Sequence, residues 1–140
     1  MLFEEEIQVD SSPVVIPPRE KSLWLDKLFS QEKILHRLNL TLDAGRFPHC
    51  SLISGPSGSG QLIFALHIVQ HLFCKHENKP CGVCDACFKV NQLVHPDLHF
   101  SYPTVGAKSL STSVIDIWRT TLKHNPYINI QHWLEKLDQE

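Results

Sequence analysis

Apolar residues recur at helical spacing in the first half of the chain. The pattern predicts a helix over residues 30–44, because four apolar positions fall on one face: Ile34, Leu35, Leu38 and Leu42. Ser30 is a suitable N-cap for this helix, and Gly45 suits the position just past its end. Residues 60–73 predict a second helix that is apolar on most sides, so we expect it to be largely buried.

Three further helices are expected beyond residue 80. A short one lies around residues 85–94, and an amphipathic one covers residues 112–124, with Trp118 and Leu122 on its apolar side. Asn125 and Pro126 stop this second helix. A final short helix carries three large apolar residues: Trp133, Leu134 and Leu137.

Two short stretches have the patterns of strands. Residues 50–54 form an apolar run between Pro48 and Gly55, which fits a buried strand. Residues 97–102 alternate apolar and polar positions, which is typical of a half-buried strand. Strands that alternate with helices predict an α/β domain with a parallel sheet flanked by helices. Cys50 would then be a buried, inert thiol on the first strand.

The start of the chain differs from the rest. Residues 8–22 contain Pro13, Pro17 and Pro18 and predict an extended segment, so we divide the chain into an acidic lead-in, 1–29, and a domain, 30–140. The net charge of -2 argues against binding a polyanion through bulk charge. No apolar run is long enough to span a membrane, and no secretory signal is visible, so a cytoplasmic protein is expected.

A glycine-rich loop follows the first predicted strand and opens the second predicted helix. Its residues are Gly55, Pro56, Ser57, Gly58, Ser59 and Gly60. Strand, loop and helix in this order are the context of a phosphate-binding P-loop, whose N–H groups and helix N-terminus favour an anion. An ordinary Gly/Ser connection between strand and helix is the alternative.

The two residues after the loop lack the chemistry of ATP use. Gln61 stands where a P-loop has the lysine that reaches the terminal phosphates, and Leu62 stands where a hydroxyl would bind Mg²⁺. An amide cannot supply the electrostatic stabilisation of a lysine cation. We therefore expect a degenerate loop that binds no ATP and has no ATPase activity.

Four of the five cysteines lie within residues 74–87, and they are the most specific feature of the chain. Cys74, Cys81, Cys84 and Cys87 can supply four thiolates to a tetrahedral zinc site, which would be structural because it leaves no open position. Such a site would pin two helices together. Disulfides, free thiols, or a ligand role for His71 or His76 are the alternatives.

Other residues are expected to be structural. His95 and His99 have no partner nucleophile at a recognisable spacing. Asp116 follows an apolar pair with helical period, so it is expected on a solvent-facing helix surface and not in a Mg²⁺ site. The tryptophans, Trp24, Trp118 and Trp133, are expected in the core or an interface and not in a base-stacking platform.

Five short motifs, taken in order, resemble a known family. They begin with Ser30-Gln31-Glu32, continue through the segments at 45–49 and 52–56 and the cysteine cluster, and end with His95-Pro96-Asp97. The series resembles the clamp-loader subunits of bacterial DNA polymerase III, the gamma/tau and delta-prime group of AAA+ proteins. The segments around Trp118-Arg119 and Asn125-Pro126-Tyr127 look like delta-prime from the Bacteroidetes branch.

The resemblance implies a fold and a role. The fold would be the N-terminal part of an AAA+ P-loop domain with an inserted four-cysteine zinc module. Gamma/tau have the complete loop with lysine and threonine, whereas delta-prime commonly has a decayed one, which Gln61 and Leu62 match. Delta-prime is a stator in a complex with gamma/tau and delta that loads the sliding clamp on primed DNA. The family's acidic motif, arginine finger and lid would lie beyond Glu140, and Arg119 lacks the arginine-finger setting.

Two alternative functions are kept. The first is an ATP-binding motor subunit of the gamma/tau kind with an atypical loop, against which Gln61 argues. The second is a zinc-dependent module that binds DNA directly, against which the near-neutral charge and the lack of a basic patch argue.

Overall fold

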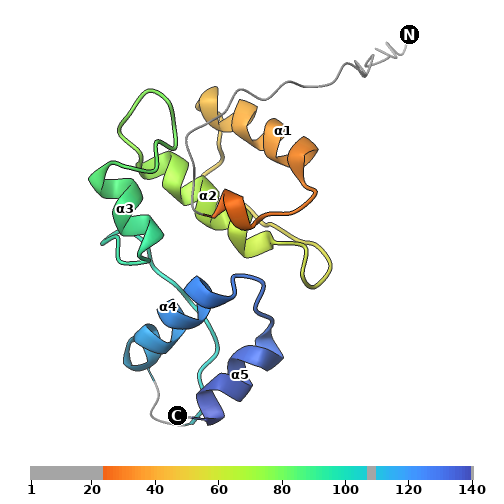
Figure 1. Ribbon diagram of the computed structural model, residues 1–140, viewed down its shortest axis with the longest axis vertical. Coiled ribbons are helices and arrows are strands. Elements are labelled where there is room, and N and C mark those ends of the chain that lie inside the picture. The colour runs from red at the N-terminus through yellow and green to blue at the C-terminus, as the bar shows by residue number, and fades with distance from the viewer. Residues whose placement is uncertain (1–23, 107–109, 140) are drawn as a thin grey trace.

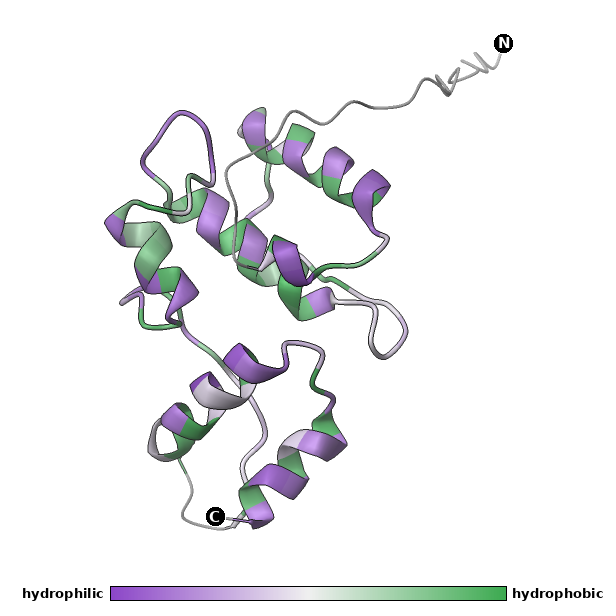
Figure 2. Cartoon of the chain, in the orientation of Figure 1, coloured by the Kyte–Doolittle hydropathy of each residue, from purple (hydrophilic) through white to green (hydrophobic). Residues whose placement is uncertain are grey.

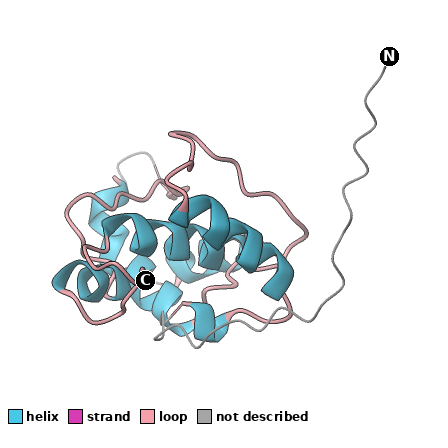
Figure 3. Cartoon of the chain, turned by 90° about the horizontal axis from the view of Figure 1, so that it is seen from above, coloured by secondary structure: helices cyan, strands magenta, loops and turns pink. Residues whose placement is uncertain are grey.

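In a computed structural model of the 140-residue chain, residues 24–106 and 110–139 are described, and all their regular elements are helices (Figures 1 and 3). In chain order these are η1 (Leu25–Lys27), α1 (Glu32–Asp43), α2 (Gln61–Phe73), α3 (Asp85–Asn91), η2 (Ser111–Val114), α4 (Ile115–His124) and α5 (Ile130–Asp138). Figure 1 shows α1, α2 and α3 gathered in one part of the molecule and α4 and α5 in the other.

The expected first helix forms, but with a different start. Ser30 has a left-handed backbone with φ of 55°, and the N-cap is Gln31, whose side chain makes no capping bond, so the predicted Ser30 cap is wrong. The expected end is confirmed. Gly45 has φ of 64°, and the N–H groups of Gly45 and Arg46 donate to the carbonyls of Leu42 and Thr41, which closes the helix in a Schellman motif.

The second helix is buried as expected. Ile63, Leu66 and His67 are among its inaccessible residues. Gly60 is its N-cap with φ of 85°, a conformation that suits glycine. A β-carbon at this position would lie 2.8 Å from Cδ1 of Leu28, so close packing also requires glycine here.

The third helix is shorter than the predicted 85–94. It ends at Asn91 because Leu93 takes a left-handed conformation with φ of 59°. The N–H groups of Leu93 and Val94 donate to the carbonyls of Val90 and Lys89, which is again a Schellman arrangement. Leucine is strained in this conformation, and its burial, with 1% of its surface exposed, offsets that strain.

The two predicted strands do not form in the described residues, so the expected parallel sheet is not confirmed. Residues 50–54 have no regular structure, and Leu52 is 92% exposed instead of buried. Residues 97–102 keep the expected alternation, with Tyr102 buried and His99 exposed, but they too are irregular. A strand is defined by hydrogen bonds to a neighbour, and neither segment has a ladder partner in the described part of the chain.

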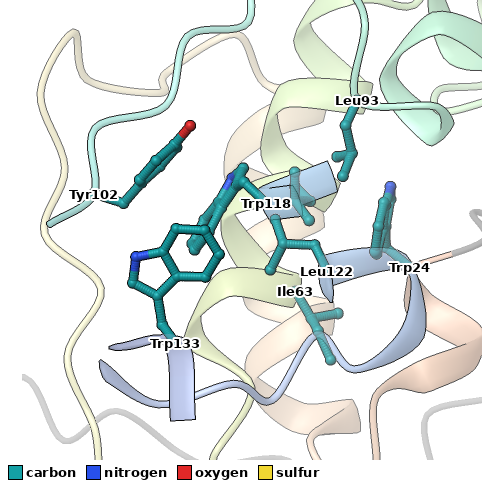
Figure 4. Packing of buried hydrophobic residues seen from close by; sticks show 8 residues of the cluster. Trp24, Ile63, Leu93, Tyr102, Trp118, Leu122 and Trp133 are labelled. Carbon is teal, nitrogen blue, oxygen red and sulfur yellow. The ribbon is translucent and has the colours of Figure 1, made fainter. Parts of the chain in front are cut away.

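Aromatic residues dominate the core that joins the two parts of the molecule (Figure 4). The rings of Tyr102 and Trp118 stack with centroids 4.5 Å apart, and Trp118 meets Trp133 edge-on at 5.0 Å. The core also holds Trp24, Ile63, Leu66, Leu93 and Leu122. The expectation that the three tryptophans are core residues is therefore confirmed.

The second half forms much as predicted. The expected helix over 112–124 consists of η2 followed by α4, and it ends at His124 before Asn125 and Pro126. The side chain of Asn129 caps α5 by accepting a hydrogen bond from the N–H of His132 at 2.8 Å. Among the residues described, no helix is long and apolar enough to cross a membrane. The extended segment expected over residues 8–22 lies outside the described residues.

Candidate metal centre and phosphate loop

The cysteine cluster lies where α2 ends and α3 begins. Cys74 is the C-cap of α2, Cys84 is the N-cap of α3, and Cys87 lies in the first turn of α3. Cys81 comes from the intervening segment, which is largely hydrophilic (Figure 2). The chain therefore supplies its thiols from two helix ends and the loop between them.

The four sulfur atoms are close enough to share one ion. All lie within 4.8 Å of one another, and the Sγ atoms of Cys81 and Cys87 are 3.9 Å apart. Tetrahedral zinc with bonds of about 2.3 Å sets its sulfurs about 3.8 Å apart, so small shifts would complete the site. Main-chain N–H groups of Cys81, Cys84 and Cys87 already donate to cluster sulfurs over 3.3–3.5 Å. The donor set and spacing therefore fit zinc.

Two of the thiols differ in acidity. Burial opposes ionisation of Cys84, but hydrogen bonds, first from the main-chain N–H of Cys87, outweigh it and lower the pKa of Cys84 to about 6. Burial raises the pKa of the Cys87 thiol well above its usual range. A metal ion that binds here would therefore displace a proton from Cys87, which couples metal affinity to pH.

The alternative ligands do not join the cluster. In the described part of the chain, the group able to hold a metal consists of the four cysteines alone, without His71 or His76. Nε2 of His71 lies 3.6 Å from a carboxylate oxygen of Asp43 on α1. Cys50 lies apart from the group and is exposed, so its predicted burial is wrong. The cause is the missing sheet around residues 50–54.

The glycine-rich loop keeps the shape of a turn that leads into a helix. The N–H of Ser59 donates to the carbonyl of Pro56 at 3.2 Å, and Gly58 has φ of 82°. Gly60 then caps α2, and its carbonyl accepts the N–H of Phe64 at 3.1 Å. Loop and helix N-terminus are thus joined as in a phosphate site.

Gln61 folds back into this loop. Its side-chain amide Nε2 donates to the carbonyl of Gly55 at 2.7 Å and to the carbonyl of Pro56 at 3.0 Å. The group that replaces the lysine is therefore bonded to the loop itself. Leu62 is half-buried and packs against the core. An apolar side chain therefore stands where a P-loop has its Mg²⁺-binding hydroxyl.

A cavity of about 320 Å³ borders the loop on its α1 side, and no sequence pattern predicted it. Its lining includes Gln61 and Ser59 from the loop region, and several apolar side chains from α1, α2 and the segment between them: Ile34, Leu38, Phe47, Ile53, Phe64 and Ile68. These apolar residues are spread over three segments, so only the fold brings them together.

Two of the residues expected to be structural, His95 and Asp116, have local partners in the fold. The ring of His95 stacks on Phe73 with centroids 4.2 Å apart, and its Nδ1 accepts the N–H of Asp97 at 3.2 Å. Asp116 is 93% exposed on α4, where its carboxylate lies 3.3 Å from the Arg119 guanidinium, so it lies on a solvent-facing helix surface as expected.

Two polar pairs inside the helix packing were not foreseen. On α2, Nε2 of His67 lies 2.8 Å from Oδ1 of Asn39 on α1, and Nε2 of Gln70 donates to Oδ1 of Asn91 on α3 at 2.8 Å. The signal was present in the sequence, since His67 and Gln70 interrupt an otherwise apolar helix. A buried polar residue must have a partner, and its partner cannot be read from spacing alone.

The comparison with protein families shows to which family the chain belongs. The model of the family described as DNA polymerase III, delta subunit, matches residues 30–133. The chain belongs to this family. This result agrees with the resemblance to the DNA polymerase III clamp-loader family that the order of motifs indicated.

Curated members of this DNA polymerase III group cover both subunit types. The chain is 38% identical over 63 residues to subunit gamma/tau of Mycobacterium tuberculosis, which is 44% of this chain and 11% of that protein. It is 30% identical over 81 residues to subunit delta' of Bacillus subtilis, 57% of this chain and 25% of that protein. With delta' of Haemophilus influenzae it shares 32% over 92 residues, 65% of this chain and 28% of that protein.

These likenesses leave the choice between delta-prime and gamma/tau open, and the Bacteroidetes branch stays a prediction. The chain spans between 11% and 28% of the length of these relatives. No solved structure matches it significantly.

Proposed function

We propose that this DNA polymerase III family member is a stator of the delta-prime kind, which helps to load the sliding clamp on primed DNA without using ATP itself. The observation that carries the proposal is the side-chain amide of Gln61, bonded to the carbonyls of Gly55 and Pro56. An amide held in this way offers no cation to a triphosphate. The partners would be gamma/tau and delta in a cytoplasmic hetero-oligomer that includes the clamp and DNA.

The same proposal gives the cysteine cluster a structural role. Cys74, Cys81, Cys84 and Cys87 would bind one zinc ion, which links the end of α2 to the start of α3. Four thiolates leave no open coordination position, so this ion would stabilise the fold and take no part in chemistry.

A motor subunit of the gamma/tau kind is the second candidate. The similarity to a mycobacterial gamma/tau and the preserved turn between Gly55 and Gly60 favour it. The two candidates differ in one property: a motor subunit must bind ATP through its own loop.

Reconstitution of the clamp loader tests the role. The protein as the cell makes it would be assembled with gamma/tau and delta of the same organism, and ATP-dependent clamp loading on primed DNA would be measured. For the stator, Gln61→Ala should leave the loading rate unchanged, whereas alanine in place of the loop lysine of the motor subunit should abolish it. A loss of about tenfold or more with Gln61→Ala would instead support the motor.

A further inference from the structure

A buried hydrogen bond links α2 and α3 one helical turn away from the cysteine cluster. Gln70 is fully inaccessible, and its Nε2 donates to Oδ1 of Asn91 at 2.8 Å. The same nitrogen lies 3.5 Å from the carbonyl of Cys87. The bond therefore lies beside the segment that carries two of the four thiols.

The hydrogen bond and the cysteine cluster lie on the same faces of α2 and α3. Gln70 precedes Cys74 by four residues on α2, and Asn91 follows Cys87 by four residues on α3. Residues four apart lie on the same face of a helix. The two helices thus meet at Cys74 and Cys87, and meet again one turn further from the cluster at Gln70 and Asn91.

A polar pair in the contact between α2 and α3, the seam that also holds Cys74 and Cys87, restricts the helices to one register more strictly than an apolar pair does. Burying the amide of Gln70 is unfavourable unless it is hydrogen-bonded, so the helices are most stable in the register that keeps the bond. A satisfied buried polar contact favours one arrangement, whereas apolar side chains tolerate small sliding. Cys74 and Cys87, with 2% and 0% of their surfaces exposed, lie in the same seam and are held in that register.

We propose that Gln70 and Asn91 are positioning residues for the metal site: they hold α2 and α3 in the register that brings Cys74 and Cys87 together. Neither residue binds the ion. This inference rests on the proposed zinc site and extends it to two residues that the cysteine motif does not contain. Partners of this kind around a metal site typically change its affinity by about 10- to 100-fold.

Zinc affinity measured by competition with a chromogenic chelator tests the proposal on the intact chain. Asn91→Leu removes the acceptor and should weaken zinc binding about tenfold. Asn91→Asp keeps an acceptor oxygen and should restore most of the affinity. Asn39→Leu is the matched control, because it removes a 2.8 Å contact to the same helix, α2, on the side of α1. This control should bind zinc like the wild type.

The Co²⁺-substituted proteins give a second readout. A tetrahedral thiolate site in the wild type should give intense visible bands, which Asn91→Leu should shift or weaken and Asn39→Leu should leave unchanged. If Asn91→Leu does not fold, Asn91→Ala removes the same acceptor without added bulk and takes its place.

Three results would overturn the proposal. Wild-type zinc affinity in Asn91→Leu would show that the pair has no effect on the metal. Equal weakening by Asn39→Leu would show that loss of general stability explains the effect. A wild-type chain that binds no zinc would overturn the metal site together with the positioning pair, whereas the first two results leave the metal site intact.

Discussion

Nε of Arg119 donates a hydrogen bond of 2.9 Å to the main-chain carbonyl of Leu93, so α4 is tied to the turn that ends α3. This turn is where Leu93 takes its left-handed conformation. Nearby, Nζ of Lys123 donates to Oε1 of Gln92 at 2.7 Å. Two basic residues of α4 therefore contact the end of α3, and they connect the part of the chain that carries the four cysteines to the aromatic core.

Replacing Arg119 should loosen this connection. Arg119→Met keeps much of the apolar stem but leaves the carbonyl of Leu93 without this donor, and we expect unfolding to become easier by about 1 kcal/mol. Asp116→Asn is the control, since Asp116 is 93% exposed and its ion pair with Arg119 should contribute less than about 0.5 kcal/mol. Urea unfolding measures both. Equal effects of the two variants would contradict the assignment.

Trp133 should be among the most sensitive core positions. It is 2% exposed, and its indole N–H donates to the carbonyl of Pro103 at 2.8 Å. Trp133→Ala should lower the free energy of unfolding by about 3–5 kcal/mol, because it leaves a cavity and an unpaired carbonyl. Ile130→Ala on the same helix is the control, since Ile130 is 63% exposed and its loss should matter little. A tolerated Trp133→Ala would disprove the packing of α5 on the core.

Loss of one cysteine ligand should release the metal. Cys81→Ser should lower the zinc content of the purified protein and its melting temperature together, because metal binding and folding are coupled. Cys50→Ser is the matched control, since Cys50 is exposed and outside the cluster. Elemental analysis and thermal unfolding check the result. Retained zinc and unchanged melting in Cys81→Ser would show that Cys81 is not a ligand.

Stability should fall at alkaline pH through Tyr102. Burial raises the pKa of Tyr102, an effect that Arg119 partly opposes, and its hydroxyl donates to the carbonyl of Ser111 at 2.6 Å. Above the pKa of about 10 of a free tyrosine, the folded state keeps a proton that the unfolded state loses, so stability decreases as pH rises. Urea unfolding at pH 9 and at pH 10.5 should show a smaller decrease for Tyr102→Phe than for the wild type. An equal decrease would refute the role of Tyr102.

The sequence predicted the helices better than the contacts between them. The period of Ile34, Leu38 and Leu42 and the glycine at position 45 are local signals, and the helix they predict forms with nearly the same bounds. The strands at 50–54 and 97–102 depend on partners elsewhere, which no local pattern supplies. Tertiary contacts such as Arg119 with Leu93, or Gln70 with Asn91, likewise join residues 20 or more positions apart.

In the candidate sites, too, the local features were predictable from the sequence and the contacts between segments were not. The spacing of the cysteines was enough to predict that their thiols lie close together. Cys81, Cys84 and Cys87 are each three residues apart, and the last two lie at the start of α3. The substitution at Gln61 was visible, but its bonds to Gly55 and Pro56 were not, because they depend on the curl of the loop. The cavity beside the loop depends on three separate segments and could not be inferred.

Restoring the two missing side chains should test whether the loop can still take a phosphate. Gln61→Lys together with Leu62→Thr supplies the cation and the Mg²⁺-binding hydroxyl on a turn that still leads into α2. We expect measurable Mg-ATP binding in the double variant, and Gln61→Lys alone should bind more weakly because the metal ligand is missing. Isothermal titration calorimetry compares them. No binding by the double variant would show that the loop has lost more than these two groups.

The most direct test is a Mg-ATP titration of the zinc-loaded wild-type protein by isothermal titration calorimetry. The account predicts no binding at millimolar nucleotide, because Gln61 bonds to the loop carbonyls and Leu62 packs into the core. Micromolar binding would contradict the account and identify the chain as an ATP-binding motor subunit.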